Sequence, residues 1–257
     1  MTDPSGTPSE PSSYEARPRR RATAQDRALW LVDRLVIRAW FRLRVEGAER
    51  LPAGPSVLCF NHQSWIDPFV VTASLPREPV LFFFGPREAR MDNSLKNRFI
   101  LWTQRVVPYR PAKDNLLSVT RRVERVLVAG ARMAIAAEGR IHVGESVLLP
   151  LEDGAVFLAL RARVPLVPVA VNGVGWLRFR GRVRVRLGAP IEIGGRPTKQ
   201  AVDEANGRLA AALLALTADW PDSTPPGRLS RWLTELFNDW PEGARPPVPP
   251  RAWTGRG

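Results

Sequence analysis

The sequence predicts an α/β fold, a single domain with a largely parallel central sheet flanked by helices and preceded by an N-terminal amphipathic helix. Two observations carry this prediction. From residue 56 onward, short apolar segments of the kind that form buried strands alternate with longer segments of helical periodicity. In addition, 257 residues with 44% hydrophobic content suffice for one sizeable domain with its own core.

The chain begins with two basic segments of different character. Residues 1–23 are polar and proline-rich, contain no apolar stretch typical of a signal peptide and end in RPRRR, so we expect a disordered basic tail. Residues 24–45 show helical periodicity, with one apolar side and arginines on the rest. A helix of this type suits a membrane surface or ordinary packing on the domain, and the periodicity alone does not decide between them.

Strands and helices alternate through the main domain, which we place at residues 46–220. Strands are expected at 56–60, 80–84, 105–109, 132–137, 164–171 and 182–188. Helices are expected at 64–75, 94–104, 115–130, 153–162 and 199–220. The segment 182–188 alternates Arg with Val or Leu, which predicts one solvated face. Residues 221–257 are expected to hold a short helix and an unstructured, proline-rich tail.

The charge of the chain limits its partners. Lys plus Arg number 38 against 25 Asp plus Glu, a net charge of +13, which attracts nucleic acid, an anionic membrane surface or phosphorylated substrates. No helix-turn-helix, zinc-finger or RNP-like motif supports nucleic-acid binding, which we keep as the non-enzymatic alternative. The single cysteine, Cys59, excludes an intrachain disulfide and favours a reducing compartment.

The stretch NHQSWIDP contains His62 and, five positions later, Asp67. If Ser64 is a helix N-cap, Asp67 falls in the first helical turn, where side chains lean back toward the helix N-terminus. Asp67 then serves either as a helix cap or as the partner of His62. A histidine paired with a carboxylate is a positioned general base. The sequence contains no GxSxG motif that would make His62 part of a hydrolase triad.

Four short blocks occur in order along the chain: NHQSWIDP, RVVPYR, IAAEGR and VPLVPVAV. Together they resemble the conserved blocks of the glycerolipid acyltransferases, typified by 1-acylglycerol-3-phosphate acyltransferases, over roughly residues 45–215. The resemblance implies that His62 removes a proton from an acceptor hydroxyl, which attacks an acyl thioester on coenzyme A or acyl carrier protein. Asp67 would orient His62, and the backbone N–H groups at residues 64–68 would stabilise the oxyanion.

The second and third blocks imply the acceptor site. Arg110, Glu138, Gly139 and Arg140 would bind the phosphate of a lysophospholipid, with 1-acylglycerol-3-phosphate as the first expectation. The third block departs from the family's usual Pro-Glu-Gly-Thr-Arg, since alanine replaces the proline and Arg140 replaces the threonine. Another hydroxylated lipid, a catalytically inactive relative and a thioesterase therefore stay open as alternatives.

The same resemblance implies the location and the partners. A lysolipid acceptor and its two-chain product both reside in a bilayer, so we expect a peripheral protein on the cytoplasmic face of the cell membrane. The basic tail and the helix over 24–45 would be two weak anchors on an anionic surface. No metal or cofactor is expected beyond the acyl donor, because His142, the other histidine, has no partner at ligand spacing.

Overall fold

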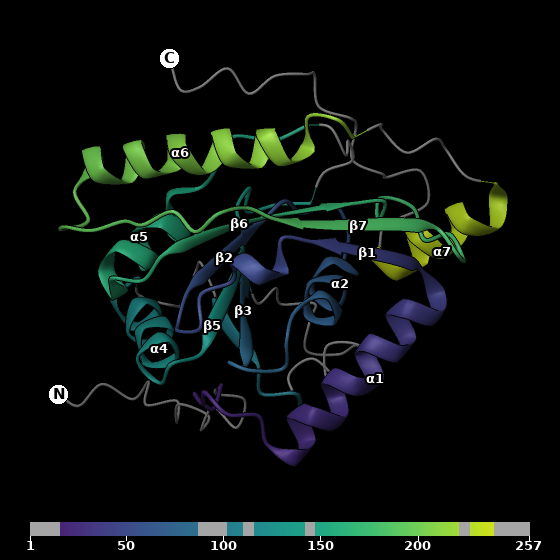
Figure 1. Ribbon diagram of the computed structural model, residues 1–257, viewed down its shortest axis with the longest axis horizontal. Helices are drawn as coiled ribbons and strands as arrows, with labels where there is room; N and C mark the ends of the chain where they lie inside the picture. The colour runs from purple at the N-terminus through teal and green to yellow at the C-terminus, as the bar shows by residue number, and fades with distance from the viewer. Residues whose placement is uncertain (1–15, 87–101, 110–115, 142–146, 221–226, 239–257) are drawn as a thin grey trace, which may run out of the picture.

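A seven-stranded sheet forms the centre of the computed structural model, which describes residues 16–86, 102–109, 116–141, 147–220 and 227–238 (Figure 1). The strands are β1 (Arg42–Glu46), β2 (Val57–Phe60), β3 (Leu81–Pro86), β4 (Val106–Tyr109), β5 (Arg132–Ala136), β6 (Leu166–Asn172) and β7 (Arg182–Leu187). They stand in the order β1-β7-β6-β2-β5-β3-β4. Every pair is parallel except β6 with β7. The predicted α/β domain with a largely parallel sheet is confirmed.

Helices cover both faces of this sheet (Figure 1). Those in the described residues are α1 (Ala24–Trp40), α2 (Asp67–Ser74), α4 (Leu116–Val128), α5 (Asp153–Ala162), α6 (Lys199–Thr217) and α7 (Arg228–Asn238), with a short 3-10 helix η1 (Ala48–Arg50). On one face α4 packs beside α5, and α5 beside α6. On the other face α1 packs on α2. Both faces are thus closed to water, as a parallel sheet requires.

The side chains of β2 divide between the two halves of the core. Val57 and Cys59 join the apolar cluster beneath α4, α5 and α6, whereas Leu58 and Phe60 join the cluster beneath α2. Burial raises the pKa of the Cys59 thiol to about 12, so it stays protonated. The strand β6 is buried along its whole length, while β7 buries only its Val and Leu residues, as its alternating sequence predicts.

The helix predicted over residues 24–45 is shorter than expected. It ends at Trp40, and Phe41 turns the chain into an extended conformation while its own side chain is buried. The next residues, RLRVE, alternate with a period of two and form β1, which pairs with β7. The domain therefore includes both α1 and β1 and does not begin at residue 46.

The basic tail is ordered at its end. Arg19 donates two hydrogen bonds of 2.6 Å to Asp26 and lies over the Phe82 ring, 5.6 Å from its centroid. The Val80 backbone N–H donates to the Arg20 carbonyl at 3.0 Å. The prediction of a disordered tail is therefore wrong for residues 16–23, because the arginines find partners on the domain. Residues 1–15 lie outside the described part of the chain.

The buried Asp26 organises the start of α1. Its burial works to raise the pKa, but hydrogen bonds from Arg19, Thr23 and Arg105 outweigh it and hold the pKa of Asp26 well below its usual range. Thr23 and Asp26 form a capping box, which fixes where the helix begins. None of the described helices is both long and apolar enough to cross a bilayer. Most of the helix expected at 94–104, and the chain after residue 238, lie outside the described residues.

Candidate active site

His62 and Asp67 meet where β2 ends and α2 begins. The His62 Nδ1 atom lies 2.8 Å from Asp67 Oδ2. The Asp67 side chain is fully buried, whereas 20% of the His62 side chain is exposed. A buried carboxylate therefore holds one nitrogen of an imidazole whose ring reaches solvent.

Asp67 also holds the loop that precedes it. Its Oδ2 atom accepts hydrogen bonds from the backbone N–H groups of Gln63 at 2.7 Å and Ser64 at 2.9 Å. The interpretation of Asp67 as the partner of His62 is therefore confirmed, whereas as a cap Asp67 holds the turn before α2 and not the helix, whose N-cap is Ile66 without a side-chain cap. The helix itself begins at Asp67 and not directly after Ser64, because the Asp67 N–H closes a turn onto the Ser64 carbonyl at 3.0 Å.

The backbone N–H groups of this loop are already engaged. Ser64 donates to Asp67 at 2.9 Å, Trp65 to Asn238 Oδ1 at 2.8 Å, and Ile66 to the Ser64 hydroxyl at 3.4 Å. The Asp67 N–H closes the turn just described, and the following proline has no N–H. The expectation that these groups stabilise an oxyanion is therefore wrong for residues 64–68 in this conformation.

Glu138 fixes His62 from the neighbouring strand. The turn after β5 places its buried carboxylate so that Oε2 accepts from the His62 N–H at 2.9 Å and Oε1 accepts from the Leu149 N–H at 2.7 Å. A carboxylate that accepts from two backbone N–H groups is a strong structural tie. Glu138 therefore ties the histidine loop to the segment before α5, a contact different from the substrate contact expected of it.

Gly139 and Arg140 follow at the edge of a small hollow of about 300 Å³. Gly139 has a φ of +66°, and a side chain there would place its Cβ 2.8 Å from Glu152 Cγ, so the turn requires glycine. Arg140 is exposed to solvent, whereas Glu138 is buried. Arg110, the other predicted phosphate ligand, lies outside the described residues.

A family model described as Acyltransferase matches residues 42–172, about half of the chain. The chain belongs to the acyltransferase family. The fold is similar to the crystal structure of the 1-acyl-sn-glycerophosphate (LPA) acyltransferase, PlsC, from Thermotoga maritima, with a TM-score of 0.62 and 14% sequence identity. The match covers 78% of this chain and 81% of that one. The predicted family is confirmed, and at this identity the structural likeness concerns the fold.

Two asparagines of the acyltransferase site escaped sequence reasoning. Asn61 extends β2 toward β6: its Nδ2 donates to the Val171 carbonyl at 2.9 Å, and its Oδ1 accepts from the Val171 N–H at 2.7 Å. A polar residue between an apolar strand and His62 was a usable signal for it. Asn238 contacts Ser64 and Trp65 from 174 and 173 positions away, and no local pattern predicts such a contact.

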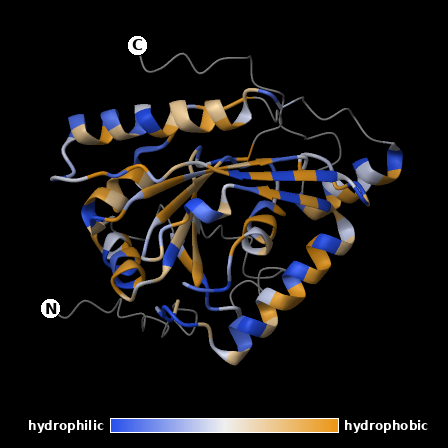
Figure 2. Cartoon of the chain, viewed as in Figure 1, coloured by the Kyte–Doolittle hydropathy of each residue, from blue (hydrophilic) through white to orange (hydrophobic). Residues whose placement is uncertain are grey.

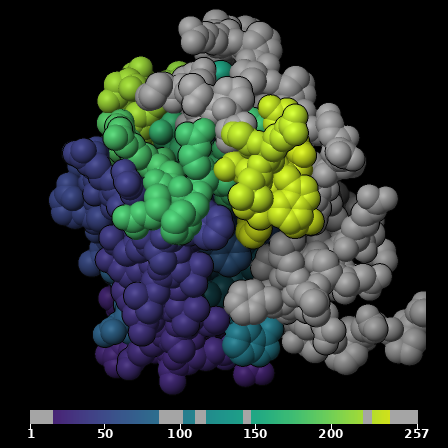
Figure 3. All heavy atoms as spheres, turned by 90° about the vertical axis from the view of Figure 1, so that its right-hand side faces the viewer, coloured from purple at the N-terminus to yellow at the C-terminus, as the bar shows by residue number. Residues whose placement is uncertain are grey.

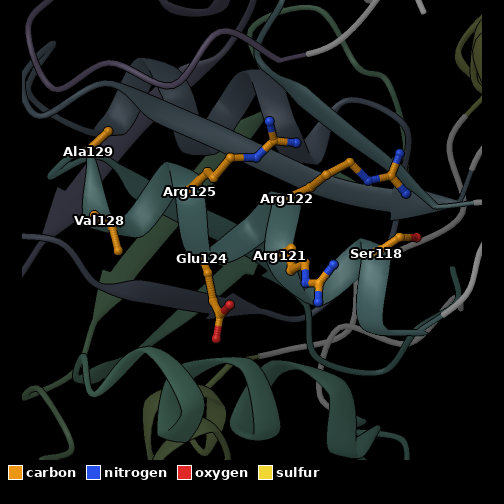
Figure 4. Close-up of a pocket in the computed structure, with 7 residues that line it drawn as sticks. All are labelled: Ser118, Arg121, Arg122, Glu124, Arg125, Val128 and Ala129. Carbon is orange, nitrogen blue, oxygen red and sulfur yellow. The ribbon is translucent and has the colours of Figure 1, made fainter.

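A larger groove, of about 760 Å³, lies elsewhere on the acyltransferase, on α4 (Figure 4). Ser118, Arg121 and Glu124 are among the residues that line it, and all of them come from α4 or the residue after it. None belongs to the His62–Asp67 pair or its contacts. Within the described ranges, no three His, Cys, Asp or Glu side chains gather as metal ligands would.

Proposed function

We propose that this acyltransferase moves a fatty acyl group from an acyl thioester to the hydroxyl of a lysophospholipid, with 1-acylglycerol-3-phosphate as the first candidate, in phospholipid biosynthesis. The donor is acyl-CoA or acyl carrier protein. The 2.8 Å contact between His62 Nδ1 and Asp67 Oδ2 is the observation that carries this proposal. It provides an oriented general base within the family-matched part of the chain.

The proposed reaction needs one general base to take and return a proton. Because Asp67 engages Nδ1, His62 Nε2 is the nitrogen that accepts the proton of the acceptor hydroxyl. The hydroxyl oxygen attacks the thioester carbonyl, and the tetrahedral intermediate expels the thiolate. Nε2 returns the proton to that thiolate, so an ester and a free thiol leave the site and His62 is regenerated. Asp67 stabilises the imidazolium between the two proton transfers.

Phosphate recognition falls to the edge beside Glu138. The exposed guanidinium of Arg140 borders the hollow, and Arg110 follows β4 in the sequence. An arginine fork binds phosphate oxygens in pairs, which suits a lysophospholipid head group. We assign Arg140 and Arg110 to this phosphate contact. Glu138 and Gly139 instead fix the conformation of the loop.

Both α1 and α7 carry large exposed apolar side chains, and Figure 3 shows these two helices on one side of the molecule, which we call the α1–α7 face. Figure 2 shows the alternating apolar and polar residues of α1. Trp40 packs edge-on against Phe179, with ring centroids 5.4 Å apart, which connects α1 to the loop before β7. The large exposed apolar side chains here are Leu31, Val32, Leu35, Val36, Trp40, Phe179, Leu229, Trp232 and Leu236. We assign this face to an anionic membrane surface on the cytoplasmic side, where the net charge of +13 adds attraction.

Product identification tests the proposal. The purified protein is incubated with labelled acyl-CoA or labelled acyl carrier protein and anionic vesicles that contain one lysolipid each. We expect labelled phosphatidic acid with lysophosphatidic acid as the acceptor. Labelled product from a different lysolipid would change the assigned acceptor, and free fatty acid alone would make the protein a thioesterase. Retention on DNA but not on vesicles would favour the nucleic-acid alternative.

A further inference from the structure

The helix α7 reaches into the His62 loop from a part of the chain outside the family match, which ends at residue 172. We propose that Asn238 is a positioning residue that sets the geometry of the His62–Asp67 pair; this inference rests on the proposed function. Asn238 is 4% exposed, although asparagine is usually a surface residue. A buried amide that costs free energy to desolvate must be held by its hydrogen bonds.

The two ends of the Asn238 amide have different partners. Its Oδ1 accepts from the Ser64 hydroxyl at 3.1 Å and from the Trp65 N–H at 2.8 Å. Its Nδ2 donates to the Thr234 carbonyl one turn earlier in α7, at 2.8 Å. The helix therefore orients the amide, and the amide in turn holds the loop.

Short hydrogen bonds connect the loop that Asn238 holds to the His62–Asp67 pair. The Ser64 N–H, adjacent to the residue that Asn238 holds, donates to Asp67 Oδ2 at 2.9 Å. The same oxygen contacts His62 Nδ1 at 2.8 Å. A loop released at Trp65 would shift the Ser64 N–H and change how Asp67 presents its oxygen to His62. Displacements of about 1 Å are enough to lower a catalysed rate by about a hundredfold.

A second buried contact of α7 provides the matched control. The fully buried Thr234 hydroxyl accepts from the Leu177 N–H at 2.8 Å and donates to the Ser230 carbonyl at 2.6 Å, so both of these hydrogen bonds go to residues outside the His62 loop. Loss of this contact weakens the docking of α7 without removing the Asn238 amide. Thr234 and Asn238 thus separate the packing of the helix from the positioning of the loop.

Three variants of the full chain test the inference: Asn238→Leu, Asn238→Asp and Thr234→Val. We expect Asn238→Leu, of similar size but without an acceptor, to lower kcat by about tenfold to a hundredfold with KM within about twofold. Asn238→Asp retains the acceptor for Trp65 but loses the Nδ2 donor to the Thr234 carbonyl, so it should keep more of kcat than Asn238→Leu. Thr234→Val should lower the melting temperature and leave kcat within about twofold of the wild type.

A spectroscopic readout separates positioning from stability. The chain has two histidines, so the ring-proton NMR signals of His62 can be assigned by comparison with His142→Gln. We expect these signals to move in Asn238→Leu and to stay in place in Thr234→Val.

Three results would overturn the role of Asn238. One is an unchanged kcat in a folded Asn238→Leu. Another is an equal loss of kcat in Thr234→Val. The third is a folded Asn238→Asp variant whose kcat has fallen as far as that of His62→Ala. This third result also decides the case in which Asn238→Leu does not fold. Absence of acyl transfer in the wild type would instead remove the proposed function.

Discussion

The loop at residues 61–67 and the outer face of α1 depart from the usual distribution of side chains in opposite ways. In the loop, polar side chains such as Asn61, Ser64 and Asp67 are almost completely buried. On α1, apolar side chains such as Leu35 and Val36 are 60% and 58% exposed. Folding alone favours neither arrangement, because buried polar groups and exposed apolar groups both cost free energy.

The two regions differ in what offsets the free-energy cost of their buried polar or exposed apolar side chains. Hydrogen bonds within the protein compensate the loop, since Asn61, Asp67 and Glu138 all bond to backbone groups. Within the described residues, no other part of the chain covers the α1 stripe, so its compensation must come from a partner. The loop is therefore held largely by bonds inside the protein, although among the described residues the Gln63 side-chain amide and Asp67 Oδ1 are buried without a hydrogen-bond partner. The α1 face, under the proposed function, is covered only on a membrane.

The largest expected effect comes from removal of the general base. His62→Ala should lower kcat/KM for acyl transfer by about 10²–10⁴-fold, because no group remains to take the acceptor proton. Steady-state kinetics with the labelled donor measure this loss, and circular dichroism checks the fold. His142→Ala is the matched control, and similar losses in both variants would show that His62 is not the base.

The next largest effect is expected from loss of Glu138, which links the His62 loop to the segment before α5. Glu138→Ala leaves the N–H groups of His62 and Leu149 without their acceptor, so the free energy of unfolding should fall by about 2 kcal/mol or more. The activity should fall by about tenfold as His62 moves. Urea denaturation and kinetics measure the two effects. For comparison, Glu124→Gln breaks an exposed ion pair with Arg161 and should cost less than about 1 kcal/mol.

A smaller effect distinguishes buried carboxylates with and without hydrogen bonds. Burial raises the pKa of Asp33 from 3.8 to about 7, against the opposing charge of Arg105, and its Oδ2 has no hydrogen-bond partner among the described residues. A raised pKa in the folded state means that Asp33 costs stability as the pH rises from 4 through 7.

Asp33→Asn should therefore raise the free energy of unfolding at pH 8 by about 2 kcal/mol and change it little at pH 4. Urea denaturation at both pH values measures the difference. Asp203→Asn, at an exposed ion pair with Lys199, serves as the control and should stay within about 0.5 kcal/mol at both. An equal gain at pH 4 and pH 8 would contradict a raised pKa for Asp33.

The smallest expected effect concerns the α1 face. Replacement of Leu35 and Val36 by glutamate should weaken binding to anionic vesicles by about tenfold or more, because two apolar side chains no longer leave water on binding. Vesicle sedimentation measures the partition. The melting temperature and the activity on a short-chain, water-soluble acceptor should change little, and a protein that binds vesicles as before would place the membrane contact elsewhere.

The sequence predicted most of the fold because local patterns determine it. The helix over 153–162 and the alternating strand at 182–188 follow directly from their periodicity, and the spacing of His62 and Asp67 placed both at the β2–α2 junction. The end of α1 at Trp40 was missed because the helical period and the strand period overlap there. The engagement of the Trp65 N–H was missed because its acceptor, Asn238, is far away in the sequence.

That separation has a consequence for the order in which the protein matures. A hydrogen bond across 174 positions closes a long loop, and contacts between residues nearer in the sequence are expected to form before such a bond does. The strands and helices can assemble before α7 docks, but the loop gains its last two hydrogen bonds only when it does. Under the proposed role of Asn238, the full rate of acyl transfer would then be reached only when α7 docks, and chains in which α7 has not docked would work about tenfold to a hundredfold more slowly.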